Sequence, residues 1–499
     1  MLGAGLSGLA ASERLLDAGV AVTVIDAFPV PGGRVASFDV STPVAGLVAG
    51  DVVEHGLHAW FQHYTELFAL MARAGVAKPP LSGSGVYFYN PRQGHFAIEG
   101  GPMTWMLGAL GISARLTGDK ARAFRAFSRL TRDLDRALTH PEATDRESAR
   151  ALLLRYGVPE PSIDQVFLPC LFSLTSLPLE QLSALELLRW MSNLLPDPRI
   201  RSLEGGGTAA MAAPIVEYLR ARGAEVRFGI EVKRLSFDTR GRAALELAPA
   251  PDRTGVRHLL VPGFGSAAPP DPAAFDAVVC ALPWERLLAV LPEPPEFARA
   301  VWSGMRQLDN VHPLTIRLWF ERPIERARER YVLCAGTLFD VLRPTPEKRR
   351  YDGIRMIDLL IENIDSQLPG FRYRHERYLN DAAEVQPIVE RVLADLEPMY
   401  PGQIRGNRAL RSFLHTREGI VACRPGVWSR RPSQYIGSPH FVLAGDWTRQ
   451  PFGTCMEGAV RSGRLAAESL LAGRAIDEPV PSTLGRIGQS LWSAVASRN

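Results

Sequence analysis

The stretch Gly3-Ala4-Gly5-Leu6-Ser7-Gly8 decides the fold, because its three glycines have the spacing of a turn that joins a strand to a helix. The first glycine permits a tight turn, the second lets a diphosphate approach the backbone, and the third lets the helix pack closely on a sheet. Ser7 falls in the first helical turn, where free N–H groups and the helix dipole attract phosphates. The stretch therefore predicts a diphosphate cradle.

The residues that follow complete a dinucleotide-binding βαβ unit. A helix is expected from Leu6 to about Asp17, with Gly19 ending it, and Val20 to Ile25 form a β-branched run typical of a buried parallel strand. Asp26 follows this strand, 18 residues beyond Gly8, where its carboxylate can bind ribose hydroxyls. A glycine turn alone is often only a turn, but helix, strand and acid in register predict a nucleotide.

The strand that normally opens such a unit is nearly absent. Only Met1 and Leu2 precede Gly3, whereas strands of this kind span about five or six residues. We expect an incorrectly assigned start or a missing leading segment. If the chain truly begins at Met1, the sheet lacks a core strand and nucleotide affinity should suffer.

Composition indicates an ordinary globular protein. Of its 499 residues 46% are hydrophobic and 22% charged, and the net charge of +4 is too small to indicate nucleic acid. The five cysteines are scattered without a CxxC pair, which favours reduced thiols over disulfides or a metal site. No apolar run approaches the ~18 to 20 residues that span a bilayer. We expect a cytoplasmic protein, with peripheral attachment to a membrane as an alternative.

Four further segments carry a family resemblance. They are Pro31-Gly32-Gly33-Arg34, the segment Asp51 to His58, Leu443-Ala444-Gly445-Asp446-Trp447-Thr448, and the segment Met456 to Gly463. Together with the opening turn, they resemble the FAD-dependent amine oxidase superfamily. Within it, the chain is most similar to the phytoene and ζ-carotene desaturases and to squalene-associated desaturases, above all in the Gly-Leu-His segment that precedes Trp60 and Phe61.

The resemblance implies that FAD is the cofactor. The residues expected to contact it are Gly3, Gly5, Ser7, Gly8, Asp26, Gly33, Arg34, Gly56, His58, Val232, Gly445, Asp446 and Met456. Gly33 and Arg34 would lie along the diphosphate and the flavin edge, and Gly56 and His58 beside the isoalloxazine. Val232 would contact the adenine side through its backbone.

The C-terminal members of this set have their own expected roles. Gly445 and Asp446 would hold the ribityl and phosphate part, and Met456 would present a backbone N–H to the flavin pyrimidine edge. A helix N-terminus there would also stabilise the anionic reduced flavin. The sequence departs from the family at Asp26, where glutamate is usual, and at Gln62-His63, which leaves the substrate wall uncertain.

The expected fold is α/β, with a discontinuous, three-layer, Rossmann-like FAD-binding domain and an inserted mixed α+β substrate domain. A second glycine run, Glu204 to Gly207, predicts a second nucleotide-domain segment. The predicted segments are FAD-binding in 1–75, 201–295 and 421–475, a mostly helical substrate or membrane-facing part in 76–200, a substrate part in 296–420, and an amphipathic tail in 476–499.

Several residues have two readings. His58 is either an ordinary hydrogen-bonded histidine or a catalytic residue, and Glu457 is either a helix-cap acid or a catalytic base. His55, His58 and His63 are close in sequence, but no carboxylate or cysteine set completes a metal site. The apolar stripe from Met103 to Ile112, with the arginines after it, is either core or a membrane-interface helix.

The resemblance implies dehydrogenation of a long isoprenoid. A hydride would pass to flavin N5, a proton would leave the neighbouring carbon, and a quinone-type acceptor would reoxidise the flavin. Three alternatives stay open. They are an amine oxidase, a flavin-dependent isomerase or cyclase without net redox change, and a fold whose cofactor site is inactive.

Overall fold

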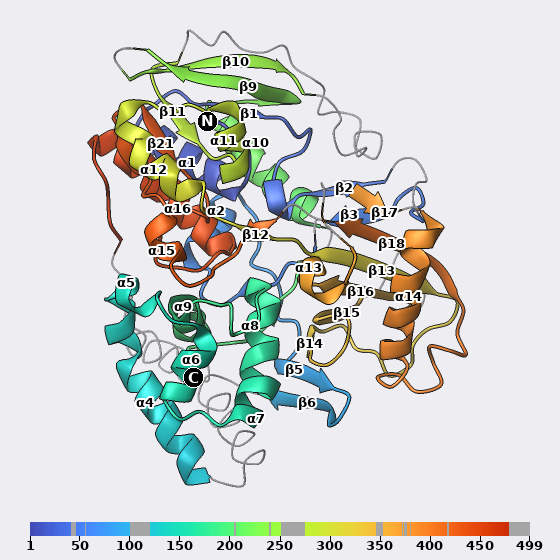
Figure 1. Cartoon of the computed structure of the whole chain (residues 1–499). Coiled ribbons are helices and arrows are strands. Elements are labelled where there is room, and N and C mark those ends of the chain that lie inside the picture. The colour runs from blue at the N-terminus through green and yellow to red at the C-terminus, as the bar shows by residue number, and fades with distance from the viewer. Residues whose placement is uncertain are drawn as a thin grey trace, which may run out of the picture.

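The computed structural model describes residues 1–40, 46–54, 56–99, 120–203, 206–238, 241–250, 275–345, 353–371, 373, 377–379, 381–416 and 419–478 (Figure 1). The predictions for His55, for Glu204 and Gly205, for the apolar stripe before residue 120 and for most of the C-terminal tail lie outside these residues.

A mainly parallel sheet organises the N-terminal glycine turn. Strand β1 (Thr23–Asp26) pairs with β8 (Glu225–Phe228), and β11 (Val278–Cys280) pairs with β21 (Phe441–Leu443), both in parallel. Strand β20 (Tyr435–Ser438) adds an antiparallel edge. Leu2 stands between the two pairs, with parallel bridges to Ile25 and Cys280. One bridging residue thus occupies the place of the opening strand.

Helices form the second layer of this region. Helix α1 (Leu6–Asp17) packs against α16 (Met456–Ala472) and α10 (Ala213–Ala221), and α10 and α16 in turn contact strands of the sheet. A Cβ on Gly463 of α16 would lie 2.0 Å from the Ser7 carbonyl oxygen, so the first and last of these helices meet backbone to backbone. The close approach explains a glycine in the middle of α16.

An antiparallel ribbon forms the third layer. Strand β9 (Ile230–Phe237) pairs with β10 (Ala243–Pro249), and β9 contacts β1 and α11 (Trp284–Val290). Figure 1 shows this ribbon along the edge of the molecule, with the sheet between it and the helices. The observed three layers match the predicted nucleotide-binding architecture.

A second sheet of eight strands forms the substrate-side body. All its neighbours pair antiparallel except β14 and β5, which are parallel. Helix α14 (Ala382–Leu396) contributes to its core with α13 (Ile364–Gln367). In sheet order the strands are β17 (Arg377–Leu379), β18 (Ala409–Thr416), β13 (Leu314–Phe320), β16 (Met356–Ile361), β15 (Val341–Thr345), β14 (Val332–Cys334), β5 (Gly85–Asn90) and β6 (Gly94–Glu99).

The predicted mostly helical part, 76–200, therefore begins with a hairpin, because β5 and β6 belong to this sheet. The helices that follow are α4 (Lys120–Leu138), α5 (Pro141–Thr144), α6 (Ala149–Arg155), α7 (Glu160–Ser162), α8 (Leu168–Thr175) and α9 (Ala184–Leu194). A π-helical turn at Ile163–Phe167 separates α7 from α8. Among the described residues, no helix combines the length and apolarity needed to cross a bilayer.

The remaining elements of the structure are short. They are the 3-10 turn η1 (Gly33–Val35), β2 (Ser37–Asp39), β3 (Val52–Glu54), β4 (Trp60–Phe61), α2 (Thr65–Arg73), β7 (Ile200–Arg201), the π-helical turn η3 (Thr208–Ala212), the 3-10 turn η6 (Glu296–Ala298), α12 (Arg299–Met305), β12 (Asn310–Val311), β19 (Ile420–Val421) and α15 (Val427–Arg430). Between the segment of His58 and α2, the chain thus forms only the short strand β4.

Candidate functional site

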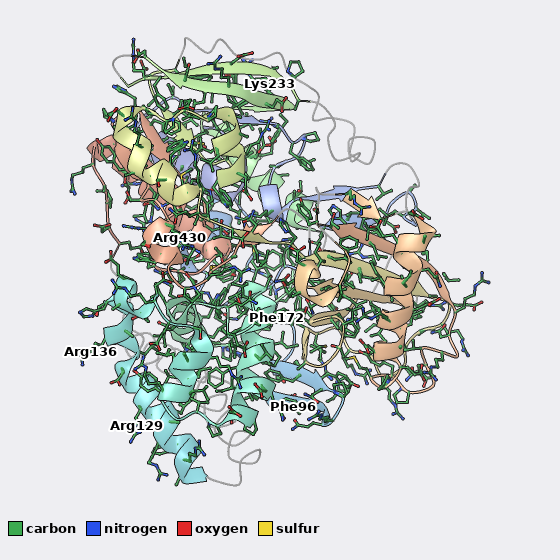
Figure 2. The ribbon with its side chains drawn as sticks, in the orientation of Figure 1. Phe96, Arg129, Arg136, Phe172, Lys233 and Arg430 are labelled. Carbon is green, nitrogen blue, oxygen red and sulfur yellow. The ribbon has the colours of Figure 1, made fainter. Side chains whose placement is uncertain are left out.

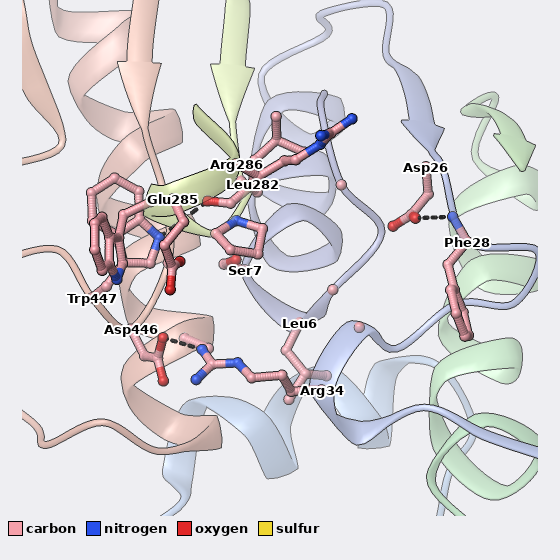
Figure 3. A pocket seen from close by; sticks show the side chains of 18 of the residues that line it. Leu6, Ser7, Asp26, Phe28, Arg34, Leu282, Glu285, Arg286, Asp446 and Trp447 are labelled. Carbon is pink, nitrogen blue, oxygen red and sulfur yellow. Dashed lines mark hydrogen bonds and ion pairs between the residues drawn. The ribbon is translucent and has the colours of Figure 1, made fainter. Parts of the chain in front are cut away.

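An elongated cavity of about 660 Å³ begins at the glycine turn and runs between the two bodies. Its wall comes from segments far apart in the sequence, mainly 3–7, 25–35, 230–232, 281–289 and 445–459. Figure 3 shows part of this wall, with Ser7, Asp26, Arg34 and Asp446 around the same space. The cavity is therefore completed only by the fold.

The glycine turn has two structural glycines and one that faces open space. Gly3 has φ +105°, and a Cβ there would lie 2.9 Å from the Ala281 carbonyl oxygen. A Cβ on Gly8 would lie 2.0 Å from the Gly3 carbonyl oxygen, and Gly8 does not line the cavity. A Cβ on Gly5 would meet only Gly33 Cα, at 3.9 Å. Gly5 thus keeps room for a ligand at the cavity wall.

Asp26 fixes this turn from the end of β1. Its Oδ2 accepts the Ala4 N–H at 2.6 Å, and its Oδ1 accepts the Phe28 N–H at 2.7 Å. Burial raises the pKa of the Asp26 carboxyl to about 6, although both backbone donors act in the opposite direction. The carboxyl lines the cavity, where it can meet ribose hydroxyls.

The turn η1 places Gly33 and Arg34 opposite the glycine turn. Gly32 and Gly33 have φ of +121° and +56°, and the Arg34 guanidinium forms an ion pair with Asp446 (Figure 3). A Cβ on Gly33 would lie 3.2 Å from Gly5 Cα, so the two glycine segments nearly touch. Arg34 therefore joins the N-terminal and C-terminal parts of the wall.

The described part of the second glycine run, Gly206 and Gly207, does not line the cavity. A Cβ on Gly207 would lie 1.9 Å from the Val35 carbonyl oxygen. Thr208 Oγ1 accepts the Ser37 N–H at 2.7 Å and donates to the Pro31 carbonyl at 2.9 Å. The segment 206–208, which we call the clamp, thus packs behind residues 31–37 and supports the ligand wall from outside.

The C-terminal wall depends on Gly445. Its φ is +139°, and a Cβ there would lie 2.3 Å from Trp447 Nε1. The Gly445 N–H donates to Ser462 Oγ at 2.9 Å, and Trp447 Nε1 donates to the Leu282 carbonyl at 3.2 Å (Figure 3). These contacts hold Asp446 at the cavity with its carboxylate toward Arg34.

Met456 begins α16 and lines the cavity, so its position agrees with the expected contact through a helix N-terminus. The next residue, Glu457, is fully buried and does not line the cavity. Its carboxylate accepts the N–H groups of Glu66 and Leu67 at 3.0 Å each and the Arg461 Nε–H at 2.8 Å. It thus caps helix α2, which favours the structural reading, although the capped helix is not its own.

His58 reaches the cavity from the segment after β3. Its Nε2 lies 2.9 Å from the Arg34 carbonyl oxygen, and its Nδ1 lies 4.0 Å from Glu54 Oε1. The Tyr331 hydroxyl donates to the His58 carbonyl at 2.6 Å. Gly56, predicted beside it, is buried and does not line the cavity.

Most of the predicted residues meet at this one cavity. Gly8 and Gly56 do not, while those in its wall are Gly3, Gly5, Ser7, Asp26, Gly33, Arg34, His58, Val232, Gly445, Asp446 and Met456. Sequence reasoning missed Glu231, whose buried carboxylate pairs with Arg286 at 2.9 Å, although it adjoins Val232. It also missed Trp284 and Glu285, which lie in the predicted FAD-binding segment 201–295. His312 and Tyr373 carried no motif, and their rings stack at 3.8 Å.

Comparison with known proteins gives the family. The family model for flavin-containing amine oxidoreductases matches residues 6–471. A probable ζ-carotene desaturase of Synechococcus elongatus is 26% identical over 95% of this chain and 99% of its own. The 15-cis-phytoene desaturase of Arabidopsis thaliana is 24% identical over 94% of this chain and 79% of its own.

Solved structures agree in fold. Putrescine oxidase bound to putrescine superposes with a TM-score of 0.64 at 15% identity, covering 94% of this chain and 98% of its own. Cyclohexylamine oxidase from Brevibacterium oxydans gives 0.63 at 14% identity, covering 95% and 98%. At such low identity, these likenesses establish the mixed α/β fold alone.

The donor set fits FAD. The open side of Gly5 at the start of α1 can receive a diphosphate, and Asp26 faces the place of a ribose. Met456 brings a second helix N-terminus to the other part of the cavity, where a flavin ring would be held. The match over residues 6–471 and this arrangement lead to one conclusion. The chain belongs to the flavin-containing amine oxidoreductase family, with FAD as its cofactor.

Proposed function

We propose that the protein dehydrogenates a long apolar isoprenoid, turning a CH–CH unit into a C=C bond. The observation that carries this proposal is the similarity to phytoene and ζ-carotene desaturases at 24–26% identity over 94–95% of the chain. FAD, when bound, supplies the two-electron acceptor at N5. The substrate loses one hydride and, from the neighbouring carbon, one proton. A quinone-type acceptor then takes the electrons.

The charges in the cavity support an apolar substrate over an amine. A carboxylate that faces the substrate would favour the binding of an alkylammonium. In the described wall, Asp26 is held by two backbone N–H groups, Glu231 pairs with Arg286, and Asp446 pairs with Arg34. Burial raises the pKa of Glu285, the other carboxyl described there, which disfavours its charged form.

The chain would contribute positioning and exclusion of water. Ile420, Val421 and Met456 give part of the cavity wall an apolar lining suited to a hydrocarbon. A hydrocarbon offers few hydrogen-bonding groups, so its placement depends on shape and on removal of water. These residues would keep the reacting C–H beside the flavin.

We also propose peripheral contact with a membrane through α4. This helix exposes Phe124 (61% exposed) and is rich in arginine, and Figure 2 shows Arg129 and Arg136 along it at the periphery of the molecule. An apolar side chain among cations favours an anionic lipid surface. Co-sedimentation with phosphatidylglycerol vesicles, but not with phosphatidylcholine vesicles, would support this contact, and its loss in Phe124→Ser would assign it to α4.

Anaerobic titration of the FAD-loaded protein tests the proposed reaction. With 15-cis-phytoene or ζ-carotene in vesicles, we expect the visible flavin absorbance to bleach as the product chromophore appears. Bleaching by putrescine, followed by peroxide release in air, would instead indicate an amine oxidase. Conversion of a carotene without bleaching would indicate an isomerase or cyclase. A protein that takes up no FAD would indicate an inactive cofactor site.

A further inference from the structure

His58 lies where the cavity meets the substrate-side sheet. Its ring belongs to the cavity wall, yet its side chain is only 10% exposed. Its Nε2 lies 2.9 Å from the Arg34 carbonyl oxygen. A carbonyl oxygen can only accept a hydrogen bond, so Nε2 carries a proton and donates it. A neutral His58 therefore has its lone pair on Nδ1.

The Nδ1 side of the ring faces Glu54 rather than the cavity. Nδ1 lies 4.0 Å from Glu54 Oε1, and Glu54 does not line the cavity. Nε2 is thus engaged by the protein, and Nδ1 is buried on the Glu54 side of the ring. A base that takes a proton from the substrate would need one nitrogen directed at the substrate.

The sheet of the substrate-side body holds the His58 segment. Tyr331, just before β14, donates its hydroxyl to the His58 carbonyl at 2.6 Å. Arg317 of β13 donates to the Val52 carbonyl at 2.6 Å and pairs with Asp358 of β16 at 2.6 Å. Val52 and His58 are therefore both fixed to this sheet, and the His58 ring extends from it to the flavin wall.

The hydrogen bond from His58 acts on the cofactor site through Arg34. Its guanidinium pairs with Asp446, and its carbonyl accepts from His58. A shift of turn η1 would disturb the Arg34–Asp446 pair and the approach of Gly33 to Gly5. The clamp restrains the same turn at Val35, Ser37 and Pro31.

We infer that His58 is a positioning residue: its Nε2–H holds the Arg34 carbonyl, and thereby fixes turn η1 against FAD relative to the substrate-side sheet. The role in FAD binding rests only on FAD being the cofactor. The statement that His58 is not the base that takes the substrate proton rests on the proposed function. Tyr331 supports the residue by holding its backbone carbonyl, and Glu54 lies on the Nδ1 side of the ring.

Matched substitutions at His58 separate positioning from proton transfer. The amide of glutamine can place an N–H donor near the position of Nε2, but it is not a base at neutral pH. In His58→Gln we expect the Kd for FAD, from quenching of flavin fluorescence on binding, to stay within about threefold of the parent. In His58→Ala we expect it to rise about tenfold, the loss of one buried hydrogen bond.

Flavin reduction completes the test. If the residue positions, His58→Gln with FAD bound keeps its rate of reduction by the carotene substrate, while His58→Ala with saturating FAD is slowed. Reduction abolished equally in both variants, with FAD affinity unchanged, would overturn the inference and make His58 the base. Unchanged FAD affinity and unchanged reduction in His58→Ala would overturn it as well.

A second variant covers the case in which His58→Ala does not fold. Tyr331→Phe removes only the hydroxyl that holds the His58 carbonyl, and we expect the FAD Kd to rise about threefold. His140→Gln, at an exposed histidine beyond α4, is the matched control and should leave the Kd unchanged. An unchanged Kd in Tyr331→Phe would count against the link to the sheet. Because FAD affinity is measured without isoprenoid, these outcomes stand even if the proposed reaction is wrong.

Discussion

Two glycine turns of this chain perform different tasks. The first, Gly3 to Gly8, contributes Gly5 to the cavity wall, and a Cβ on Gly5 would meet nothing closer than 3.9 Å. The clamp, residues 206–208, lies outside the cavity, and a Cβ on Gly207 would lie 1.9 Å from the Val35 carbonyl oxygen. In both turns, glycine lets another group lie close to the backbone. Only the fold decides whether the approaching group belongs to a ligand or to the chain itself.

The largest effect is expected from Gly207→Ala. The added methyl would overlap the Val35 carbonyl, so the clamp or turn η1 must move. We expect the FAD-free protein to lose about 3 kcal/mol of stability in urea unfolding. FAD affinity should fall as a secondary result. Unchanged stability would contradict the conclusion that Gly207, unlike Gly5, faces another part of the chain.

Thr208→Val should have the next largest effect. Valine has a similar shape, but it leaves the buried Ser37 N–H and Pro31 carbonyl without the Thr208 hydroxyl. We expect about 2 kcal/mol lower stability in the same unfolding measurement. Thr139→Val, at an exposed threonine after α4, is the control and should change stability little.

Gly5→Ala should have the opposite pattern of effects, with a loss of FAD affinity and little loss of stability. Gly5 has φ −73°, which alanine adopts freely, and its Cβ side is open. We expect stability of the FAD-free protein to change by less than about 1 kcal/mol. The FAD Kd should rise at least about tenfold, because the methyl would occupy the place of the diphosphate. Equal loss of stability and affinity would contradict a ligand-facing role.

The smallest effect concerns pH and Asp26, which holds Ala4 of the first turn. Its pKa is raised from 3.8 to about 6, so between these values the folded chain keeps a proton that the unfolded chain has lost. Stability of the FAD-free protein should therefore fall as pH rises through the pKa of the folded state, by about 1 kcal/mol between pH ~5 and ~7. Urea unfolding should show this part of the fall absent in Asp26→Asn. An identical fall in both proteins would assign it to other carboxyls.

Local spacing made the nucleotide-binding region predictable. Helix α1 spans Leu6–Asp17 as expected, and Asp26, Arg34 and Asp446 meet at one cavity. The sequence did not reveal that Glu457 caps α2, because its partners Glu66 and Leu67 lie almost 400 residues away. His312 and Tyr373 were missed because tertiary packing alone brings them to the cavity wall.

The hairpin β5–β6 was missed for a similar reason. Its partner in the eight-stranded sheet, β14, lies far along the chain, and the parallel register between β14 and β5 has no local signal. The second glycine run was found by its composition, but its packing against Val35 depends on where η1 lies. The glycine spacing predicted that another group lies close to the backbone at both turns. It could not show whether that group is a ligand or another part of the chain.

The backbone contact between Gly463 and Ser7 has a consequence for biosynthesis. Helix α1 leaves the ribosome long before α16, which packs against it and brings Met456 to the cavity. The nascent chain must therefore hold an incomplete cofactor site until α16 has been synthesised. We therefore expect FAD to be retained only after α16 has been synthesised, and products of premature termination before α16 to bind FAD poorly.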